Sequence, residues 1–297
     1  MSVIKRSTGK LHAIFALLIL ALSTAIGSIP ILFIGLLKLL PNQRLKRSCT
    51  KMVDKIATLW CAANNFYLDK LHSAHWDITG TDHFNPQNWH LVVANHQSWL
   101  DIVVLQRVFH RKIPVLKFFI KDQLKWIPLL GFSWWAMGCP FMKRYSPAYL
   151  AKNPHKKGQD LLATKKALKL FKQTPATLMS FVEGTRYTPQ KLLQQNSPYQ
   201  HLLKPKAGGV SFVIDAMNKQ INQLIDVTIV YPHQHHSLWN FLCRGVHSVK
   251  VHIRQISIPS QFLNSSLLEN AKTQLEFREW LNEQWSEKDR LINEMKA

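Results

Sequence analysis

The sequence predicts an α/β fold in which helices flank a mainly parallel sheet, together with an N-terminal membrane-embedded helical segment. Short apolar runs alternate along the chain with longer amphipathic stretches, a pattern typical of α/β folds with a parallel sheet. A stretch without Asp, Glu, Lys or Arg covers the 27 residues from Leu11 to Leu37. Apolar runs of roughly 18 residues or more indicate a membrane segment.

The chain of 297 residues suits one large domain or two small ones. We expect a basic tail over residues 1–10, the membrane-embedded segment over 11–40, an α/β domain over 41–260 and a C-terminal helical extension over 261–297. From Glu269 onwards the chain holds seven acidic and five basic residues. Such mixed charge is typical of a solvated helix face rather than of a binding tail.

The membrane-embedded segment allows two arrangements. As one straight helix it would be about 40 Å long, against about 30 Å for the hydrocarbon core of a bilayer. Gly27, Ser28 and Pro30 lie within it, and proline kinks or breaks helices. Basic residues flank both sides, so the positive-inside rule selects no orientation. We expect either a helical hairpin that dips into one leaflet or a tilted, kinked span. The run is too long for the apolar core of a usual signal peptide.

The remaining elements follow from local patterns. Amphipathic spacing predicts helices over residues 51–75, over 101–110 and in the tail from Leu267. Short apolar runs predict strands at Leu91–Ala94, Leu178–Val182, Val227–Tyr231 and Val249–Ile253.

Two clusters each allow two interpretations. Trp126, Trp134 and Trp135 lie among apolar and basic residues, which suits either a membrane interface or a buried core patch. Lysines at helical spacing within residues 158–173 suit either a solvated face or contact with anionic headgroups.

The formal net charge of +21 favours polyanionic surroundings, namely nucleic acid, an anionic membrane or phosphorylated substrates. No known motif for DNA or RNA is present, so we expect no nucleic-acid partner. The four cysteines lack metal-binding spacing and predict free thiols in a reducing compartment. His233, His235 and His236 follow a strand and suggest zinc, but no carboxylate or cysteine follows closely. We therefore expect a solvated histidine loop and no metal.

The sharpest motif is Asn95-His96-Gln97-Ser98-Trp99-Leu100-Asp101, which follows a predicted strand and opens a predicted helix. Loops at the carboxyl ends of strands are where α/β proteins bind ligands. A histidine there can act as a general base. An aspartate five residues later can fold back across the first helical turn and orient the imidazole. A structural histidine beside a helix-terminal aspartate is the alternative.

A second motif, Phe181-Val182-Glu183-Gly184-Thr185-Arg186, ends another predicted strand. Its glycine permits close backbone approach, and arginine binds phosphate oxygens in a planar fork. A surface ion pair at a turn is the alternative. Lys204 and Lys206, before Gly208-Gly209, are further phosphate candidates or exposed loop lysines.

Together these motifs resemble the glycerolipid acyltransferase family that includes the bacterial 1-acylglycerol-3-phosphate acyltransferases. That family carries four blocks in order, and they correspond to Asn95–Asp101, Gly138–Arg144, Glu183–Arg186 and Val227–Pro232. The resemblance spans roughly residues 90 to 232, and its first and third blocks are specific. Two features depart from the pattern: Val182 stands where the family has proline, and Thr228 and Tyr231 stand where small apolar residues are common, in a strand that the family places along the acyl site.

The resemblance implies a role for each matching residue. His96 and Asp101 are the catalytic pair, with His96 as the base that takes the proton of an acceptor hydroxyl. Arg144 would hold the acceptor's phosphate. The substrate pocket would be completed by Glu183, Gly184, Thr185 and Arg186, and Asn95, Ser98 and Lys206 are further candidates for substrate binding.

The implied reaction moves a fatty acyl group from a thioester to a free hydroxyl of a lysophospholipid, with lysophosphatidate as the first choice of acceptor. Lysophosphatidylglycerol, another lysolipid and glycerol-3-phosphate are the alternatives. The acyl donor is acyl-CoA or acyl carrier protein, used as a co-substrate, and no cofactor is expected. Membrane lipids are the partners, and the expected location is the cytoplasmic membrane with the catalytic domain on its cytoplasmic face.

Overall fold

A six-stranded sheet with the order β1-β8-β7-β2-β6-β3 forms the centre of the molecule. Its strands are β1 (His75–Gly80), β2 (His90–Ala94), β3 (Leu116–Phe118), β6 (Thr177–Phe181), β7 (Gln223–Val230) and β8 (Ser248–Ser257). A separate pair holds β4 (Ile120–Lys121) and β5 (Phe141–Met142). This computed structural model describes residues 3–81, 83–142, 149, 152–153, 171, 174–217, 219–232, 236–264, 267 and 270–297.

The direction of the strands brings two loops together. β2 pairs in parallel with β6 on one side and with β7 on the other. The segments after these strands therefore leave from the same edge of the sheet. β2 is apolar on both faces, as expected for a central parallel strand. β8 runs antiparallel to β7, and β1 runs parallel to β8. The predicted α/β class with a mainly parallel sheet is confirmed.

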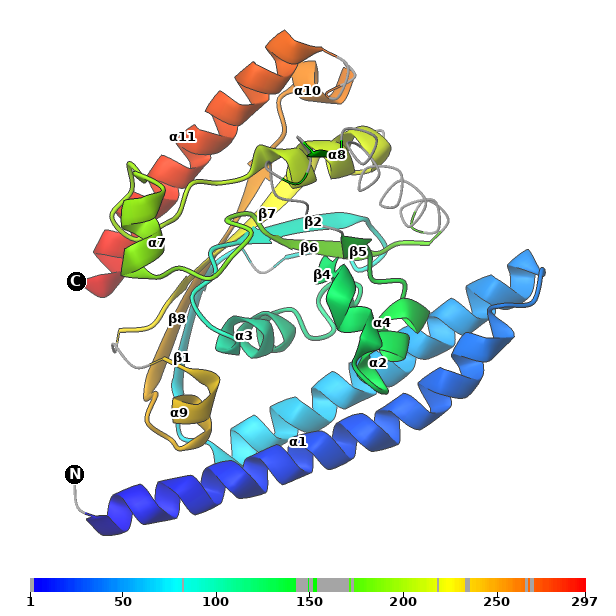
Figure 1. The fold of residues 1–297 in the computed structure, drawn as a ribbon, viewed down its shortest axis with the longest axis vertical. Helices are drawn as coiled ribbons and strands as arrows, with labels where there is room; N and C mark the ends of the chain where they lie inside the picture. Colours follow the sequence, from blue (N-terminus) through cyan, green and yellow to red (C-terminus); the bar gives the residue numbers. More distant parts are fainter. Residues whose placement is uncertain are drawn as a thin grey trace.

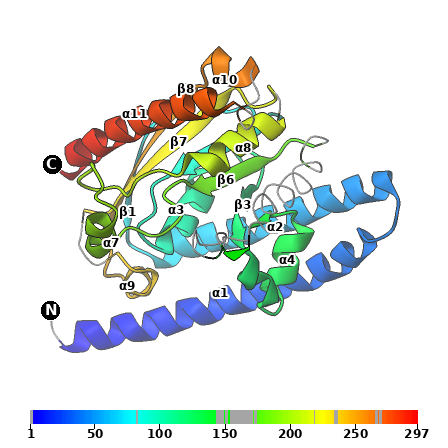
Figure 2. The same cartoon turned by 45° about the horizontal axis from the view of Figure 1, so that its top comes forward.

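Helices cover both faces of the sheet (Figures 1 and 2). Alternate residues of β2 show the two layers, because Val92 and Ala94 face one apolar core whereas Leu91 and Val93 face another. The first core is covered by α3 (Leu100–Val108), α9 (Leu238–Leu242) and parts of the two N-terminal helices. The second is covered by α8 (Ala207–Met217), α10 (Ser260–Asn264) and α11 (Ala271–Lys296). Shorter elements are η1 (Asp122–Trp126), α4 (Leu130–Ala136) and α7 (Pro189–Gln194).

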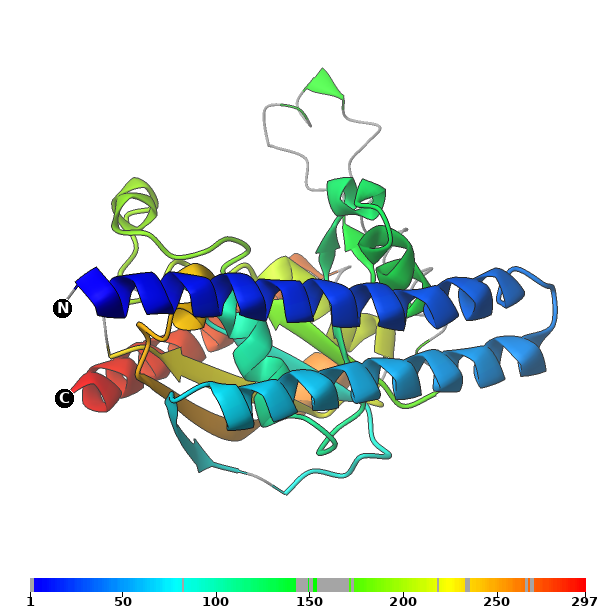
Figure 3. The same cartoon turned by 90° about the horizontal axis from the view of Figure 1, so that it is seen from below.

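The N-terminal helices α1 (Val3–Leu37) and α2 (Gln43–Leu71) run side by side in opposite directions (Figure 3). Asn42 begins α2, since its side chain accepts a hydrogen bond from the Leu45 amide at 3.1 Å. α1 continues through Pro30 as one helix. The alternative of a hairpin within residues 11–40 is therefore wrong, because the chain reverses only after Leu37. The amphipathic helix predicted over residues 51–75 is confirmed as α2.

α1 is apolar but poorly covered. Among the described residues it contains one stretch, Thr8–Leu37, that is long and apolar enough to cross a membrane by length and composition alone. Its best window has a mean hydropathy of 2.4 and is 17% buried. Both halves of α1 nevertheless contact the α/β domain: Ala13 and Ala16 pack beside α9, and Ile31 and Ile34 pack with α4.

The C-terminal helix α11 starts at Asn270, whose side chain accepts hydrogen bonds from the next turn's amides. It buries Phe277, Leu281 and Trp285 against α8 and the sheet. Lys288 and Asp289 are buried as well. The prediction of a solvated charged face is wrong for these two residues. The lysine-rich segment 158–173 lies almost entirely outside the described residues.

Candidate active site

The loop after β2 is held by its first residue. Asn95 is 1% exposed, and its side chain bonds to both backbone groups of Ile229 on β7, each at 2.9 Å. The side-chain amide thus continues the β2–β7 ladder beyond the end of β2. Gln97 also donates to the Ile229 carbonyl, at 2.8 Å. Asn95 therefore fixes the position of the loop, and its polar atoms are not available to a substrate.

His96 and Asp101 form the predicted pair. His96 Nδ1 lies 2.8 Å from Asp101 Oδ2. The same oxygen accepts hydrogen bonds from the amides of Gln97 and Ser98, at 2.7 and 2.9 Å. Asp101 is fully buried in the first turn of α3, so these donors stabilise its charge away from water. This arrangement places the Nδ1 proton on His96 toward Asp101 and leaves Nε2 as the basic nitrogen.

The second oxygen of Asp101 has a partner that the motif did not suggest. Tyr231, directly after β7, donates its hydroxyl to Asp101 Oδ1 at 2.6 Å. Burial and the charge of Asp101 raise the pKa of this phenol well above its usual value, so it remains a donor. The resemblance placed Thr228 and Tyr231 along the acyl site. Both residues are instead buried, and neither lines the cavity that contains His96.

Phe181 fixes the plane of the His96 ring. The two rings are stacked, with centroids 3.8 Å apart and an interplanar angle of 13°. Phe181 ends β6, next to β2 in the sheet, so the strand register Ala94–Phe181 sets this contact. Phe181 begins the second motif, but the sequence does not predict this contact, because stacking depends on the pairing of two distant strands.

Glu183 lies behind the histidine rather than beside a substrate. It is fully buried, and its two oxygens accept the amides of His96 and Leu203 at 3.1 and 3.0 Å. Burial raises the pKa of Glu183 to about 8, although the two amides and Lys288 act in the opposite direction. The expected substrate-binding role does not fit this position. Glu183 instead connects the two loops that follow β2 and β6.

The rest of the second motif lies at the surface of the site. Gly184 has φ of +72°, a left-handed conformation that favours glycine at this turn. Arg186 is exposed, and its guanidinium carbon lies 5.4 Å from the centroid of the Trp99 ring. Thr185 accepts a hydrogen bond from Lys191 at 2.8 Å. All three residues of Gly184–Arg186 line the same cavity as His96.

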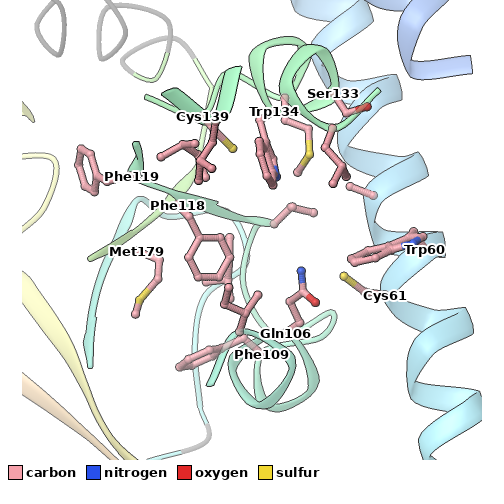
Figure 4. Close-up of a pocket in the computed structure, with 18 of the residues that line it drawn as sticks. Trp60, Cys61, Gln106, Phe109, Phe118, Phe119, Ser133, Trp134, Cys139 and Met179 are labelled. Atoms are coloured by element: carbon pink, nitrogen blue, oxygen red, sulfur yellow. The ribbon is translucent and has the colours of Figure 1, made fainter. Parts of the chain in front are cut away.

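That cavity has a volume of about 460 Å³, within the usual range for small-molecule sites. It extends from His96 to the N-terminal hairpin. Figure 4 shows Trp60 and Cys61 of α2 on the opposite side of this cavity from Phe118 and Met179. Gly27 and Ile31 of α1 and Trp60 and Cys61 of α2 form one wall. The other walls are mainly apolar and include Phe109, Phe118, Trp134, Cys139 and Met179.

Other predicted residues are placed as follows. Ser98 is buried, and its hydroxyl accepts the Leu100 amide at 3.2 Å, so it shapes the loop rather than a substrate pocket. Lys206 is exposed and does not line the cavity. Arg144 lies outside the described residues. Of the tryptophans, Trp126 is 79% exposed, whereas Trp134 lines the cavity.

The histidine loop after β7 is only partly described. His233 and His235 lie outside the described residues, and His236 stacks on Tyr231 with centroids 4.9 Å apart. All four cysteines are free thiols, as predicted. Burial raises the pKa of the Cys139 thiol to about 12, so the cavity wall at Cys139 holds a neutral thiol rather than a nucleophilic thiolate.

Curated acyltransferases are similar in sequence to this chain. Mouse 1-acyl-sn-glycerol-3-phosphate acyltransferase epsilon is 28% identical over 229 residues, which cover 69% of this chain and 57% of the relative. Mouse lysocardiolipin acyltransferase 1 is 24% identical over 248 residues, covering 80% and 61%. The chain thus spans about three fifths of the length of these relatives.

A crystal structure of the 1-acyl-sn-glycerophosphate (LPA) acyltransferase PlsC from Thermotoga maritima has a similar fold. The TM-score is 0.56 at 15% sequence identity, and the match covers 99% of this chain and 98% of that one. A family model described as Acyltransferase matches residues 75–232, more than half of the chain, and includes both motifs. The chain belongs to the acyltransferase family.

Proposed function

We propose that this protein transfers a fatty acyl group from an acyl thioester to the free hydroxyl of a lysophospholipid, with 1-acylglycerol-3-phosphate as acceptor and phosphatidate as product. One observation carries the proposal: the His96–Asp101 pair lies in the wall of a mainly apolar cavity of about 460 Å³ that reaches the N-terminal hairpin. A base at one end of an apolar cavity suits a reaction between a hydroxyl and a lipid acyl group.

The chemistry needs no nucleophile from the protein. His96 Nε2 takes the proton of the acceptor hydroxyl as its oxygen attacks the thioester carbonyl carbon. The tetrahedral intermediate collapses, the carbon–sulfur bond breaks, and the imidazolium returns the proton to the leaving thiolate. Asp101 stabilises the imidazolium through Nδ1, at 2.8 Å. General-base catalysis of this kind contributes about 10²–10⁴-fold.

The cavity supplies the room for an acyl chain. Its walls at Phe118, Met179 and Trp60 are apolar, and burying each methylene of a chain stabilises binding by about 0.8 kcal/mol. Near His96 the cavity is also lined by Arg186, an exposed cation that suits the phosphate of the acceptor. Arg144 remains the second candidate for that phosphate. The donor is acyl-CoA or acyl carrier protein, both acidic, which complements the net charge of +21.

The membrane would lie against α1. Leu18, Leu22 and Ile26 are each at least 60% exposed along this helix. Because both halves of α1 contact the α/β domain, a helix that lies along the membrane surface fits better than one that crosses it. We place the catalytic domain on the cytoplasmic face, where the free thiols and an acyl thioester are expected. The lipid acceptor then reaches the cavity through the wall formed by α1 and α2.

The proposal is tested by acyl transfer with the purified, detergent-solubilised chain and its His96→Ala variant. Oleoyl-CoA and acyl carrier protein thioesters are offered with lysophosphatidate, lysophosphatidylglycerol, lysophosphatidylinositol and lysocardiolipin, and products are identified by mass spectrometry. We expect phosphatidate from the wild type and a loss of 10²-fold or more in His96→Ala. Another lysolipid as the preferred acceptor would change the substrate and keep the mechanism. Normal activity in His96→Ala would remove His96 as the base.

A further inference from the structure

The C-terminal helix α11 approaches the catalytic loops from the face of the sheet opposite to the cavity (Figure 1). It lies outside the segment matched by the family model. Two consecutive charged residues of α11, Lys288 and Asp289, are 0% and 8% exposed. Charged side chains are rarely buried without a specific partner, so each of them calls for an explanation.

Lys288 contacts the strand that carries the Asn95 anchor. Its Nζ donates to the carbonyl of Val227 at 2.7 Å and lies 2.5 Å from Asp226 Oδ1. Val227 is paired with Ala94, the residue before Asn95. Arg254 on β8 binds the other oxygen of Asp226 at 2.8 Å. Lys288 therefore lies against β7 at the level where β2 ends and the loop that carries His96 begins.

Asp289 contacts the second loop. Its two oxygens accept the amides of His201 and Gln200, both at 2.8 Å. Two residues further on, the Leu203 amide donates to Glu183 Oε2. The other oxygen of Glu183 holds the His96 amide. A continuous chain of contacts thus runs from α11 through residues 200–203 and Glu183 to the backbone of the catalytic histidine.

We propose that Lys288 and Asp289 are positioning residues for His96: Lys288 holds the carbonyl of Val227 beside the start of the catalytic loop, and Asp289 anchors the segment that presents the Leu203 amide to Glu183. This inference rests on the proposed function, in which His96 is the base. Neither residue lines the cavity, so each acts through the backbone groups that it holds.

The geometry explains why the charge of Glu183 matters. Each of its oxygens accepts a backbone N–H, so a proton on either oxygen would point a donor at a donor. Lys288 of α11 lowers the pKa of Glu183, whereas Asp101 of α3 raises it. Tyr187 is a further titratable neighbour, and burial together with the charges of Asp289 and Glu183 raises its pKa. Burial is the largest influence and raises the pKa. The charge of Lys288 opposes this effect of burial on Glu183.

Lys288→Met tests the charge. The carboxylate is present above the pKa of Glu183 and is lost as pH falls through it. Removing Lys288 raises the pKa of Glu183. The acid limb of the plot of kcat against pH therefore moves to higher pH, and kcat at neutral pH falls about tenfold or more. Acceptor KM changes little. Asp289→Ala should lower kcat and move the acid limb in the same direction, because it loosens the segment whose Leu203 amide also lowers the pKa of Glu183. Lys272→Met, with its side chain 84% exposed on the same helix, is the matched control.

Amide hydrogen exchange in the intact protein supplies a readout that does not depend on the substrate. We expect faster exchange at the amides of His96 and Leu203 in both Lys288→Met and Asp289→Ala, and wild-type exchange in Lys272→Met. If Lys288→Met alone fails to fold, the double variant Asp226→Asn with Lys288→Met removes the buried pair together. An unshifted acid limb with wild-type exchange at both amides would overturn the inference. A wild type that transfers no acyl group would overturn the proposed function, and hydrogen exchange would still decide the positioning role.

Discussion

The two terminal helices lie on opposite faces of the sheet: α1 lines the cavity that contains His96, whereas α11 packs beneath the catalytic loops (Figures 1 and 3). Their surfaces are opposite in character. α1 is apolar, and Leu18, Leu22 and Ile26 are 63%, 62% and 60% exposed. α11 has a mixed-charge sequence, but it buries Trp285 completely and covers Lys288 as well.

This difference shows that hydropathy and burial are separate properties of a helix. Hydropathy reports the medium that a side chain prefers, whereas burial reports whether protein covers it. On α11 the apolar stripe and two charges are covered by protein, so the helix belongs to the core. On α1 most apolar side chains lack a protein cover, and lipid is the medium that suits them.

The largest expected effect concerns protein stability. Trp285→Ala on α11 should lower the free energy of unfolding by about 3–5 kcal/mol, because it leaves a cavity in the core. Leu22→Ala on α1 should change it little in detergent, since that side chain is 62% exposed. Thermal unfolding of both variants measures the contrast. Equal destabilisation would mean that protein covers α1 in solution, for example through self-association.

The second effect concerns membrane binding. Replacing Leu18, Leu22 and Ile26 together by glutamine keeps helix-forming residues but removes much of the exposed apolar surface. We expect the affinity for phospholipid vesicles to fall about 100-fold or more, as measured by vesicle co-sedimentation. Leu275→Gln, at a 51% exposed position of α11, should bind vesicles as the wild type does. Loss of binding in Leu275→Gln would assign the membrane face to α11 as well.

The third effect concerns the catalytic pair between the two helices. Tyr231→Phe removes the hydroxyl that donates to Asp101 Oδ1 and leaves that buried oxygen without this partner. A hydrogen bond to a charged group contributes about 1.5–3 kcal/mol, so kcat should fall about tenfold or more with little change in KM. Steady-state kinetics at several pH values measure this. Unchanged kcat would show that the amides of Gln97 and Ser98 suffice to hold Asp101.

The smallest effect concerns the cavity wall on α1. A side chain at Gly27 would point toward Trp60, whose Cδ1 lies 3.8 Å from the position of an added Cβ. Gly27→Leu should therefore shorten the cavity and reduce kcat/KM for long acyl donors, by about fourfold for each methylene excluded. A series of acyl-CoA lengths measures the change. Ala16→Val, buried away from the cavity on the same helix, is the control for general disturbance of α1.

Local sequence patterns predicted much of the fold. The strands at Leu91–Ala94 and Leu178–Val182 correspond to β2 and β6, because buried parallel strands are short apolar runs between polar turns. β1 and β3 were not predicted, and neither was the antiparallel direction of β8. Strand direction and pairing depend on contacts between distant segments, which a local pattern does not contain.

The candidate site divides in the same way. The five-residue spacing of His96 and Asp101 across the start of a helix predicted their contact, since this contact is local in the sequence. Glu183 was assigned to substrate binding, yet it is buried between two backbone amides. The partners Phe181, Tyr231 and Leu203 come from other strands and loops, so only the fold could reveal them.

The sequence by itself determined the α/β class, the apolar N-terminal helix and the positions of both catalytic motifs, because each depends on residue types and on spacings of a few residues. The tertiary structure decided three further matters. It placed the reversal of the hairpin between α1 and α2, gave Glu183 and Tyr231 their roles around His96 and Asp101, and brought the charges of α11 beneath the catalytic loops. These depend on which distant segments pack together, and that choice is governed by the burial of apolar surface in the two cores and by the pairing of buried charges.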